Sequence, residues 1–261
     1  MSRLVFGLQP VRETLRAHGA RVAKIYLQAD GGPALEALGR FAVSSGSVVE
    51  RVSRAALDRL SEGGRHQGAA AEAPELRLWQ VDDLELGPDA AVTLLDGVTD
   101  PQNFGATIRS AVALGTGEVV FGEHGAAPLT PATFRASAGA VEHARLVRAR
   151  SLHGAVAALV ECGLTVVALD PTAAALLSDL DLSGPAAVVV GAEDRGVSRS
   201  VKRACSALAR LPMSDRVGSL NASVAAAVAL YEVRRQRGRD EAPADVPERA
   251  DSTADACEST E

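Results

Sequence analysis

Apolar and polar positions alternate at two different spacings in the first part of the chain. Short continuous apolar runs predict buried strands, and apolar residues three and four positions apart predict helices. The elements expected are strands over 24–27 and 48–49 and helices from Pro10, over 34–44, and over 53–60 behind a capping Ser53. Residues 1–73 are therefore expected to form a small α/β unit.

From residue 91 onward, longer apolar runs alternate with helical stretches. Runs at 91–95, 118–121, 164–169 and 186–190 predict strands, and helices are expected over about 105–114, 131–140 and 151–163. A last helix carries Leu220, Val224, Val228 and Tyr231 on one face. Continuous apolar strands that alternate with helices are typical of a parallel sheet covered on both faces.

The composition divides the chain further. Residues 74–90 contain Pro74, Gly87 and Pro88 and are typical of a linker, which leaves 91–237 as a second α/β domain. Residues 238–261 hold eight acidic and two basic residues, which account for the whole net charge of −6. This segment lacks large apolar residues, so we expect a disordered acidic tail that is dispensable for activity. Without this segment the chain has no net charge. The acidic net charge of the whole chain is therefore no argument against nucleic-acid binding by the folded part.

Several classes of protein are disfavoured by what the sequence contains. No apolar run reaches the roughly 18 residues of a membrane span, and the first ten residues do not resemble a secretory signal. Cys162, Cys205 and Cys257 are far apart and form no metal-binding pattern, so we expect free thiols and no metal. We therefore expect a cytoplasmic location with no membrane partner. His66, His124, His143 and His153 belong to no acid–base pattern and are expected in loops or at the surface.

Three segments place unusual polar residues where strands of a parallel sheet end, which is where such sheets bind ligands. Asn103 and Arg109 follow the strand at 91–95, and Glu193 follows Gly191 after the strand at 186–190. Asn221 stands before the last helix. Each also has a plain structural reading: Asn103 and Asn221 as helix caps, Arg109 as a solvated side chain, and Glu193 as a loop residue.

Competing chemistries lack their sequence signatures. The chain contains no GxGxxG fingerprint, no Walker A motif, no GxSxG elbow and no HExxH. Arginine, which suits phosphate recognition, supplies all but two of the 27 basic residues. Two basic runs are candidates for RNA contact, one with Arg145, Arg148 and Arg150, the other with Arg195, Arg199, Lys202 and Arg203. Aromatic residues make up only 3%, so phosphate contacts and shape outweigh base stacking.

Together the three segments resemble the motifs of the SpoU (TrmH) family of RNA ribose 2'-O-methyltransferases, in the SPOUT superfamily. The matching stretches are 103–111, 190–198 and 211–225, and residues 136–143 resemble a further family segment. The first 73 residues are similar to the family's substrate-binding domain, notably at Phe6-Gly7 and 66–68. This two-part layout most resembles the members that methylate a guanosine of 23S ribosomal RNA.

The resemblance implies an α/β SPOUT catalytic domain with a trefoil knot, S-adenosylmethionine as cofactor, RNA as substrate and a homodimer. It implies that the methyl donor is held by Gly191, Leu211 and Leu220, with Met213 and Ser219 close by. It also implies a catalytic set of Asn103, Arg109, Glu193 and Asn221, which Ser223 can join.

The role of Arg109 is open to a physical objection. In the family the matching arginine is assigned to activating the ribose hydroxyl, but a guanidinium has a pKa above about 12 and hardly deprotonates. We expect instead an electrostatic role, on an RNA phosphate and on the developing alkoxide, with Asn103 and Glu193 orienting the side chain. The alternatives are a transfer-RNA methyltransferase and a non-catalytic RNA-binding or assembly factor with the same fold.

Overall fold

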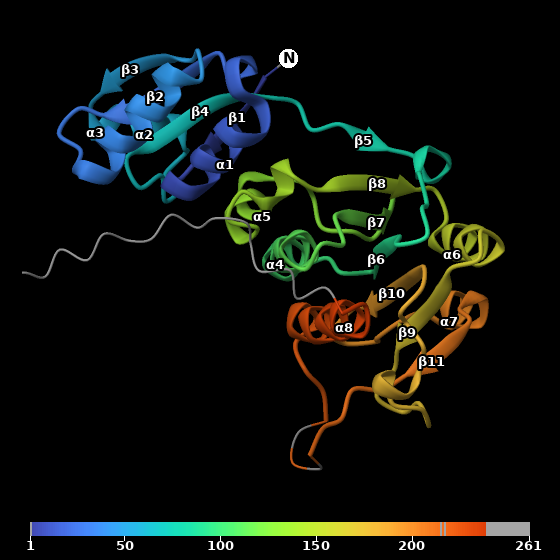
Figure 1. The fold of residues 1–261 in the computed structure, drawn as a ribbon. Coiled ribbons are helices and arrows are strands. Elements are labelled where there is room, and N and C mark those ends of the chain that lie inside the picture. Colours follow the sequence, from blue (N-terminus) through green and yellow to red (C-terminus); the bar gives the residue numbers. More distant parts are fainter. Residues whose placement is uncertain (1, 215, 217, 239–261) are drawn as a thin grey trace, which may run out of the picture.

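The structure is a computed structural model and describes residues 2–214, 216 and 218–238. These residues form two α/β bodies, each built on its own sheet (Figure 1). The α/β class predicted from the sequence is confirmed. The predicted disordered tail spans residues 238–261, all of which except Gly238 lie outside the described residues, and its disorder stays a prediction.

The N-terminal body has a four-stranded sheet in the order β1-β4-β2-β3, in which only β2 and β3 run parallel. Its elements are β1 (Ser2–Phe6), α1 (Leu8–His18), η1 (Gly19–Arg21), β2 (Lys24–Gln28), α2 (Pro33–Ser44), β3 (Val48–Val52), α3 (Arg54–Leu60) and β4 (Ala69–Pro74). The side chain of Ser53 caps α3 by accepting from the Ala56 amide, as predicted. The sequence pattern missed β4, because a run of alanines has low strand propensity and is held here by pairing on both sides.

The second body has a seven-stranded sheet in the order β11-β9-β10-β6-β7-β8-β5, with every neighbouring pair parallel. Its strands are β5 (Leu78–Trp79), β6 (Ala91–Asp96), β7 (Glu118–Gly122), β8 (Arg145–Ala149), β9 (Thr165–Leu169), β10 (Ala186–Gly191) and β11 (Ala207–Ala209). β5 lies inside the predicted linker 74–90, so this segment extends the sheet by one edge strand.

Helices cover both faces of this sheet (Figure 1). One face carries α4 (Pro101–Ala113), α5 (Pro131–Ala136) and α8 (Ala222–Gln236), and the other carries α6 (Leu152–Glu161) and α7 (Arg199–Ala204). Short 3-10 turns complete the body: η2 (Val81–Asp83), η3 (Ala140–Glu142) and η4 (Leu177–Asp179). The helix expected over 131–140 ends early, because Ala138 and Gly139 adopt positive φ and turn the chain into η3.

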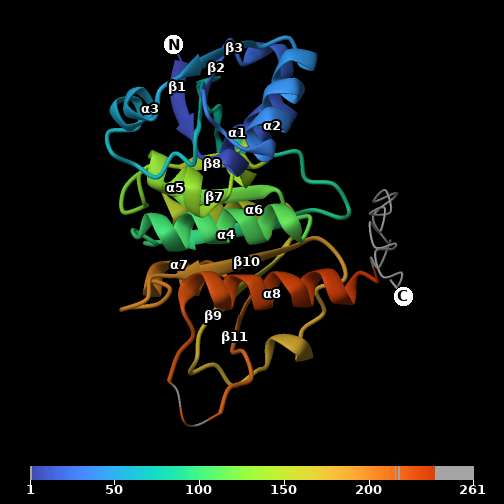
Figure 2. The ribbon, with the colours of Figure 1, turned by 90° about the vertical axis from the view of Figure 1, so that its left-hand side faces the viewer.

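The face of α8 that packs against the protein is not the face that carries Val224, Val228 and Tyr231. Val224, Val228 and Tyr231 are 43 to 58% exposed, and the buried face consists of alanines with Leu230 and Val233. Small alanines let α8 lie close to α4, beside which it runs (Figure 2). The apolar stripe of α8 therefore remains on the surface of this chain.

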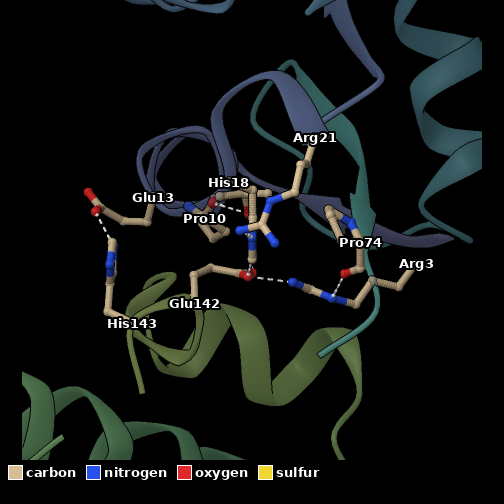
Figure 3. Close-up of polar contacts among 9 residues, drawn as sticks. Arg3, Pro10, Glu13, His18, Arg21, Pro74, Glu142 and His143 are labelled. Atoms are coloured by element: carbon tan, nitrogen blue, oxygen red, sulfur yellow. Dashed lines mark hydrogen bonds and ion pairs between the residues drawn. The ribbon is translucent and has the colours of Figure 1, made fainter. Parts of the chain in front are cut away.

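The two bodies meet through a buried carboxylate (Figure 3). The side chain of Glu142 in η3 is fully buried and forms an ion pair with Arg3 of β1. Its carboxylate also accepts from Thr14 Oγ1 at 3.2 Å and lies 2.9 Å from His18 Nε2, both on α1. We call Arg3, Thr14, His18 and Glu142 the Glu142 cluster. Three partners from one body thus surround one carboxylate from the other.

The four histidines predicted to lie in loops or at the surface do so, and two of them have tertiary partners. His66 is buried, with Nε2 3.0 Å from Asp58 Oδ1 and Nδ1 accepting from the Gly68 amide. Asp58 lies on α3, so the loop histidine is held by a tertiary contact that the local pattern does not reveal. His143 is exposed and pairs with Glu13 of α1 at 3.0 Å, beside the Glu142 cluster.

Candidate active site

Helix α4 begins two residues before Asn103 rather than at it. The side chain of Asp100 caps the helix by accepting from the amides of Gln102 and Asn103, and Pro101 occupies the first turn. The capping role considered for Asn103 is therefore wrong. Asn103 instead lies inside the first turn, 7% exposed, with its side chain free to bind other groups.

Three of the predicted catalytic residues form one hydrogen-bond network. Asn103 Nδ2 donates to Glu193 Oε1 at 2.5 Å. Asn221 Nδ2 donates to the same oxygen at 2.9 Å and to Asn103 Oδ1 at 2.8 Å. The network joins α4, the loop after β10 and the start of α8. Because an amide nitrogen can only donate and an amide oxygen can only accept, the network fixes the orientation of both asparagine side chains.

Asn221 also caps α8, as its plain structural reading predicted. Its Oδ1 accepts from the amides of Ser223 and Val224 at 2.9 and 3.3 Å, and Ser223 Oγ donates to it at 2.6 Å. The oxygen therefore serves the helix while the amide nitrogen serves Asn103 and Glu193. Ser223 also donates to Asn103 Oδ1 at 3.4 Å, which places it at the margin of the network.

The backbone around Gly191 leaves no room for a side chain at this position. A Cβ at this position would overlap the backbone of Gly196 and Val197, because the loop after β10 folds back on the strand end. The loop is tied by Gly196 N donating to Ala192 O at 2.8 Å and by Ser198 N donating to Asp96 Oδ2 at 2.6 Å. The lack of a side chain at Gly191 thus serves first the close approach of this loop to its own strand.

A cavity of about 350 Å³ lies between the loop after β10 and the segment that enters α8. It is lined by all five residues predicted to hold a cofactor, Gly191, Leu211, Met213, Ser219 and Leu220, and by Glu193. The volume falls within the range of about 300 to 1,000 Å³ typical of small-molecule sites. Segments that are well separated in the sequence therefore meet in this one hollow.

The cavity also contains an ion pair that the sequence did not predict. Lys202 Nζ of α7 donates to Asp170 Oδ2 at 2.7 Å, and Thr172 donates to Asp170 Oδ1 through its amide and its hydroxyl. The Lys202 hydrogen bond, with those from Thr172, lowers the pKa of Asp170 to about 2 although burial opposes the charge. Asp170 follows a buried strand directly, which is the signal that could have found it.

A second, smaller cavity of about 210 Å³ adjoins the first. It lies at the ends of β6 and β10 and is lined by Thr99, Asp100, Asn103 and Asp194, among others. Glu193 lines both cavities, so its carboxylate stands at their junction. Both hydrogen bonds to Glu193 use Oε1, and Oε2 has no partner among the described residues.

Arg109 is not part of this network. It lies on α4, six residues after Asn103, and is exposed. Within residues 2–214, 216 and 218–238 it forms no hydrogen bond or ion pair, and the side chains of Asn103 and Glu193 bind each other and Asn221 instead. The expected orientation of Arg109 by Asn103 and Glu193 is therefore absent in a single chain.

Family models match both bodies. Residues 90–231 match the SpoU rRNA Methylase family, and residues 4–79 match the model described as RNA 2'-O ribose methyltransferase substrate binding. The chain belongs to the SpoU family. Among relatives of this SpoU protein, an uncharacterized tRNA/rRNA methyltransferase of Mycolicibacterium vanbaalenii is 38% identical over 243 residues, covering 90% of this chain and 77% of the relative.

Solved structures of RNA methyltransferases have the same two-body architecture. A crystal structure of an RNA 2'-O ribose methyltransferase matches with a TM-score of 0.76 and 30% identity, covering 90% of this chain and 89% of the other. The SpoU methyltransferase AviRb from Streptomyces viridochromogenes, in complex with AdoMet, matches with a TM-score of 0.75 and 26% identity over 91% of each chain. This SpoU protein is thus an RNA methyltransferase whose cofactor is S-adenosylmethionine.

Two kinds of feature are not found among the described residues: a membrane-spanning helix and a cluster of metal-binding side chains. None of the helices in that part of the chain is both long and apolar enough to span a membrane. Over the same residues, no cluster of three or more histidine, cysteine or acidic side chains is arranged to hold a metal ion.

Proposed function

We propose that this SpoU protein transfers the methyl group of S-adenosylmethionine to a ribose 2'-hydroxyl of ribosomal RNA. The position of Glu193 at the junction of the two cavities carries the proposal. In it, the 350 Å³ cavity holds the methyl donor and the 210 Å³ cavity receives the acceptor ribose. In-line transfer needs donor and acceptor aligned across one short gap, and two cavities that share one wall provide this alignment.

The larger cavity suits the donor in size and in chemistry. S-adenosylmethionine combines a flat adenine, a positive sulfonium and a zwitterionic amino-acid end. The cavity offers the apolar side chains of Leu211 and Leu220 for the ring, and the Asp170–Lys202 pair places both signs of charge beside it. In this proposal Gly191, Leu211 and Leu220 hold the donor, with Met213 and Ser219 beside them.

The acceptor hydroxyl requires a group that can take a hydrogen bond as its proton leaves. Glu193 Oε2 is free to accept, and the amides of Asn103 and Asn221 hold the carboxylate in place through Oε1. A carboxylate fixed in this way can accept the hydroxyl proton while the oxygen takes the methyl group and the S–C bond breaks to leave S-adenosylhomocysteine, so no full negative charge has to develop on the ribose oxygen. Arg109 is assigned the electrostatic role on an RNA phosphate.

A guanosine of 23S ribosomal RNA is the target that the acceptor cavity favours. The Asp194 carboxylate lines this cavity without a partner among the described residues. The Watson–Crick edge of guanine presents two N–H donors, which a carboxylate can accept together. The AdoMet-bound rRNA methyltransferase of Sinorhizobium meliloti, similar over 90% of this chain at 25% identity and a TM-score of 0.72, also supports ribosomal RNA.

A homodimer is the assembly that the exposed faces of α4 and α8 support. Val224, Val228 and Tyr231 form an exposed apolar stripe, and stripes of this kind usually mark an interface. Association over this face would bring Arg109 into a site shared between two copies. Val228→Asp is expected to yield monomers, measured by light scattering after gel filtration, and a dimeric variant would contradict the interface.

We also propose the finer features that the family resemblance implies. They are a trefoil knot in the catalytic domain, a cytoplasmic location, and domains over 1–73 and 91–237 joined by 74–90. The β5 strand inside 74–90 supports a linker that is anchored to the catalytic sheet.

The deciding experiment uses tritiated S-adenosylmethionine with unmodified 23S ribosomal RNA and transfer RNA in separate reactions. Label recovered as 2'-O-methylguanosine from 23S RNA is the expected result. Label in transfer RNA alone would overturn the substrate, and label in neither RNA would overturn the proposed reaction. Arg109→Ala is expected to lose most methyl transfer and retain donor binding, with Glu161→Gln on α6 as an exposed, charge-altering control.

A further inference from the structure

The carboxyl edge of the large sheet continues beyond the donor and acceptor cavities. The register aligns Gly191 of β10 with Asp96 of β6, and Gly122 of β7 with Ala149 of β8. Along this edge the order is therefore donor cavity, acceptor cavity, the end of β7 and the end of β8. Ligands bind along such an edge because loops after every strand gather there.

A third hollow of about 590 Å³ lies at the end of β8. Its wall includes Glu123 after β7, and Arg148, Arg150 and Ser151 at the end of β8. The hollow forms where the end of β8 has no paired strand on its outer side, because β5 pairs with β8 only through Leu78 and Trp79. This leaves the last residues of β8 bordering an open space.

Arg148 also lines a fourth hollow, of about 380 Å³, between the two bodies. One side of it comes from Arg3 and Leu4 of β1, and the other from Pro131 and Phe134 of α5. Arg148 is the residue common to the two linings, which otherwise belong to opposite faces of the sheet, one beside α6 and one beside α5. We call the hollow at the end of β8 the arginine groove.

The arginines of this region have divided roles. Arg145 lines neither hollow and is held by the protein: its guanidinium lies 4.2 Å from the centroid of the Trp79 ring and donates to the Asp83 carbonyl. Arg148 and Arg150, in contrast, form no hydrogen bond or ion pair with any described residue. The carboxylates of Asp82 and Glu123 also line the groove and leave both arginines unpaired. Two unpaired guanidinium groups beside an open hollow are suited to bind phosphates.

The distance to the acceptor cavity suits a continuous nucleic-acid strand. β6 and β8 are two strands apart, which is about 10 Å at the usual strand spacing. Stacked nucleotides rise about 3.4 Å each, so roughly three of them span this gap. A strand with its target ribose at Glu193 would reach the groove within a few nucleotides.

We propose that the arginine groove binds the RNA strand beside the methylated nucleotide, with Arg148 and Arg150 on its phosphates. This rests on the proposed function and adds the path of the substrate to it. The carboxylates of the groove accept from base amino groups, which explains a mixed rather than purely basic lining.

The test replaces both arginines, Arg148→Gln with Arg150→Gln, in the full chain. The matched control is Arg40→Gln with Arg59→Gln, which removes the same charge from exposed positions of α2 and α3 that line none of the cavities described. Binding of a 23S RNA fragment is measured by filter binding over a series of salt concentrations, and methyl transfer is measured at varied RNA concentration. Circular dichroism checks that each variant is folded.

The groove variant is expected to raise KM for RNA about tenfold and to leave kcat within about twofold of the unaltered protein. Loss of two phosphate contacts lowers the slope of log affinity against log salt by about 1.4. An unchanged KM and salt slope in a folded variant would overturn the groove. If the unaltered protein methylates no RNA, the proposed function fails, while the salt series still decides whether the groove binds RNA.

Discussion

His18 and Glu142 face each other across the boundary between the two bodies, with His18 Nε2 2.9 Å from Glu142 Oε2. The Glu142 side chain is fully buried and also pairs with Arg3 (Figure 3). The hydroxyl of Thr14 completes its surroundings. A buried carboxylate is tolerated only when charged or polar partners replace the water it loses. The N-terminal body supplies all three of these partners, so the contacts of this one side chain couple the orientation of the two bodies.

Removing this carboxylate should loosen the two bodies. Glu142→Ala leaves Arg3 buried without its counter-charge, and breaking a buried pair in this way costs about 3 kcal/mol of unfolding free energy. Urea denaturation measures the loss, and small-angle scattering is expected to show a larger radius of gyration. Glu50→Ala is the control, because its pair with Lys24 is exposed. A radius equal to that of the unaltered protein would contradict the coupling.

The turn before η3 should not accept a side chain. Gly139 has φ +86°, and a Cβ there would lie 2.7 Å from the Glu13 Cβ of α1. Gly163 has φ +88°, and a Cβ there would meet nothing within 4 Å. Gly163→Ala should therefore cost only the backbone strain, about 1 to 2 kcal/mol. Gly139→Ala should cost clearly more, since α1 must also shift, and equal thermal unfolding of the two variants would argue against this contact.

The two roles of Asn221 can be separated by one substitution. Asn221→Asp keeps an oxygen that caps α8, and aspartate is as good a cap as asparagine. It loses the two N–H bonds to Asn103 and Glu193 and adds a negative charge beside Glu193. We expect methyl transfer to fall about tenfold or more while α8 remains capped, as measured by initial rates and thermal unfolding. Asn221→Ala, which loses both roles, should also lose about 1 kcal/mol of stability.

Asp170 should make a contribution to the unfolding free energy that depends on pH. Its pKa in the folded chain is lowered to about 2, chiefly by the hydrogen bond from Lys202. A lowered pKa means that the contribution is present above the ordinary value near 3.8 and is lost as the pH falls toward 2. Asp170→Asn is expected to lower the unfolding free energy by about 2 kcal/mol at pH 6. Urea denaturation at pH 6, 4 and 3 should show the difference narrowing, and a constant difference would refute the linkage.

The sequence by itself determined the class of the fold and the family. Continuous apolar runs at 91–95, 164–169 and 186–190 predict buried parallel strands, because only a strand covered on both faces dispenses with alternation. The three polar segments after these strands also carry the family resemblance, which the family models confirm. Strands that contain mainly alanine, or several arginines, were not predicted; β4 and β8 are examples. They form because they pair with neighbouring strands, and their residues have little strand propensity of their own.

Only the tertiary structure decided which polar residues act together. Asn103, Glu193 and Asn221 are up to 118 residues apart, and they meet because β6, β10 and the entry to α8 converge at one edge of the sheet. The burial of Glu142, the pairing of Asp170 with Lys202 and the exposure of the α8 stripe depend in the same way on what packs against each residue. A local pattern records which face of an element is apolar, but the partner that covers that face is chosen by the rest of the fold.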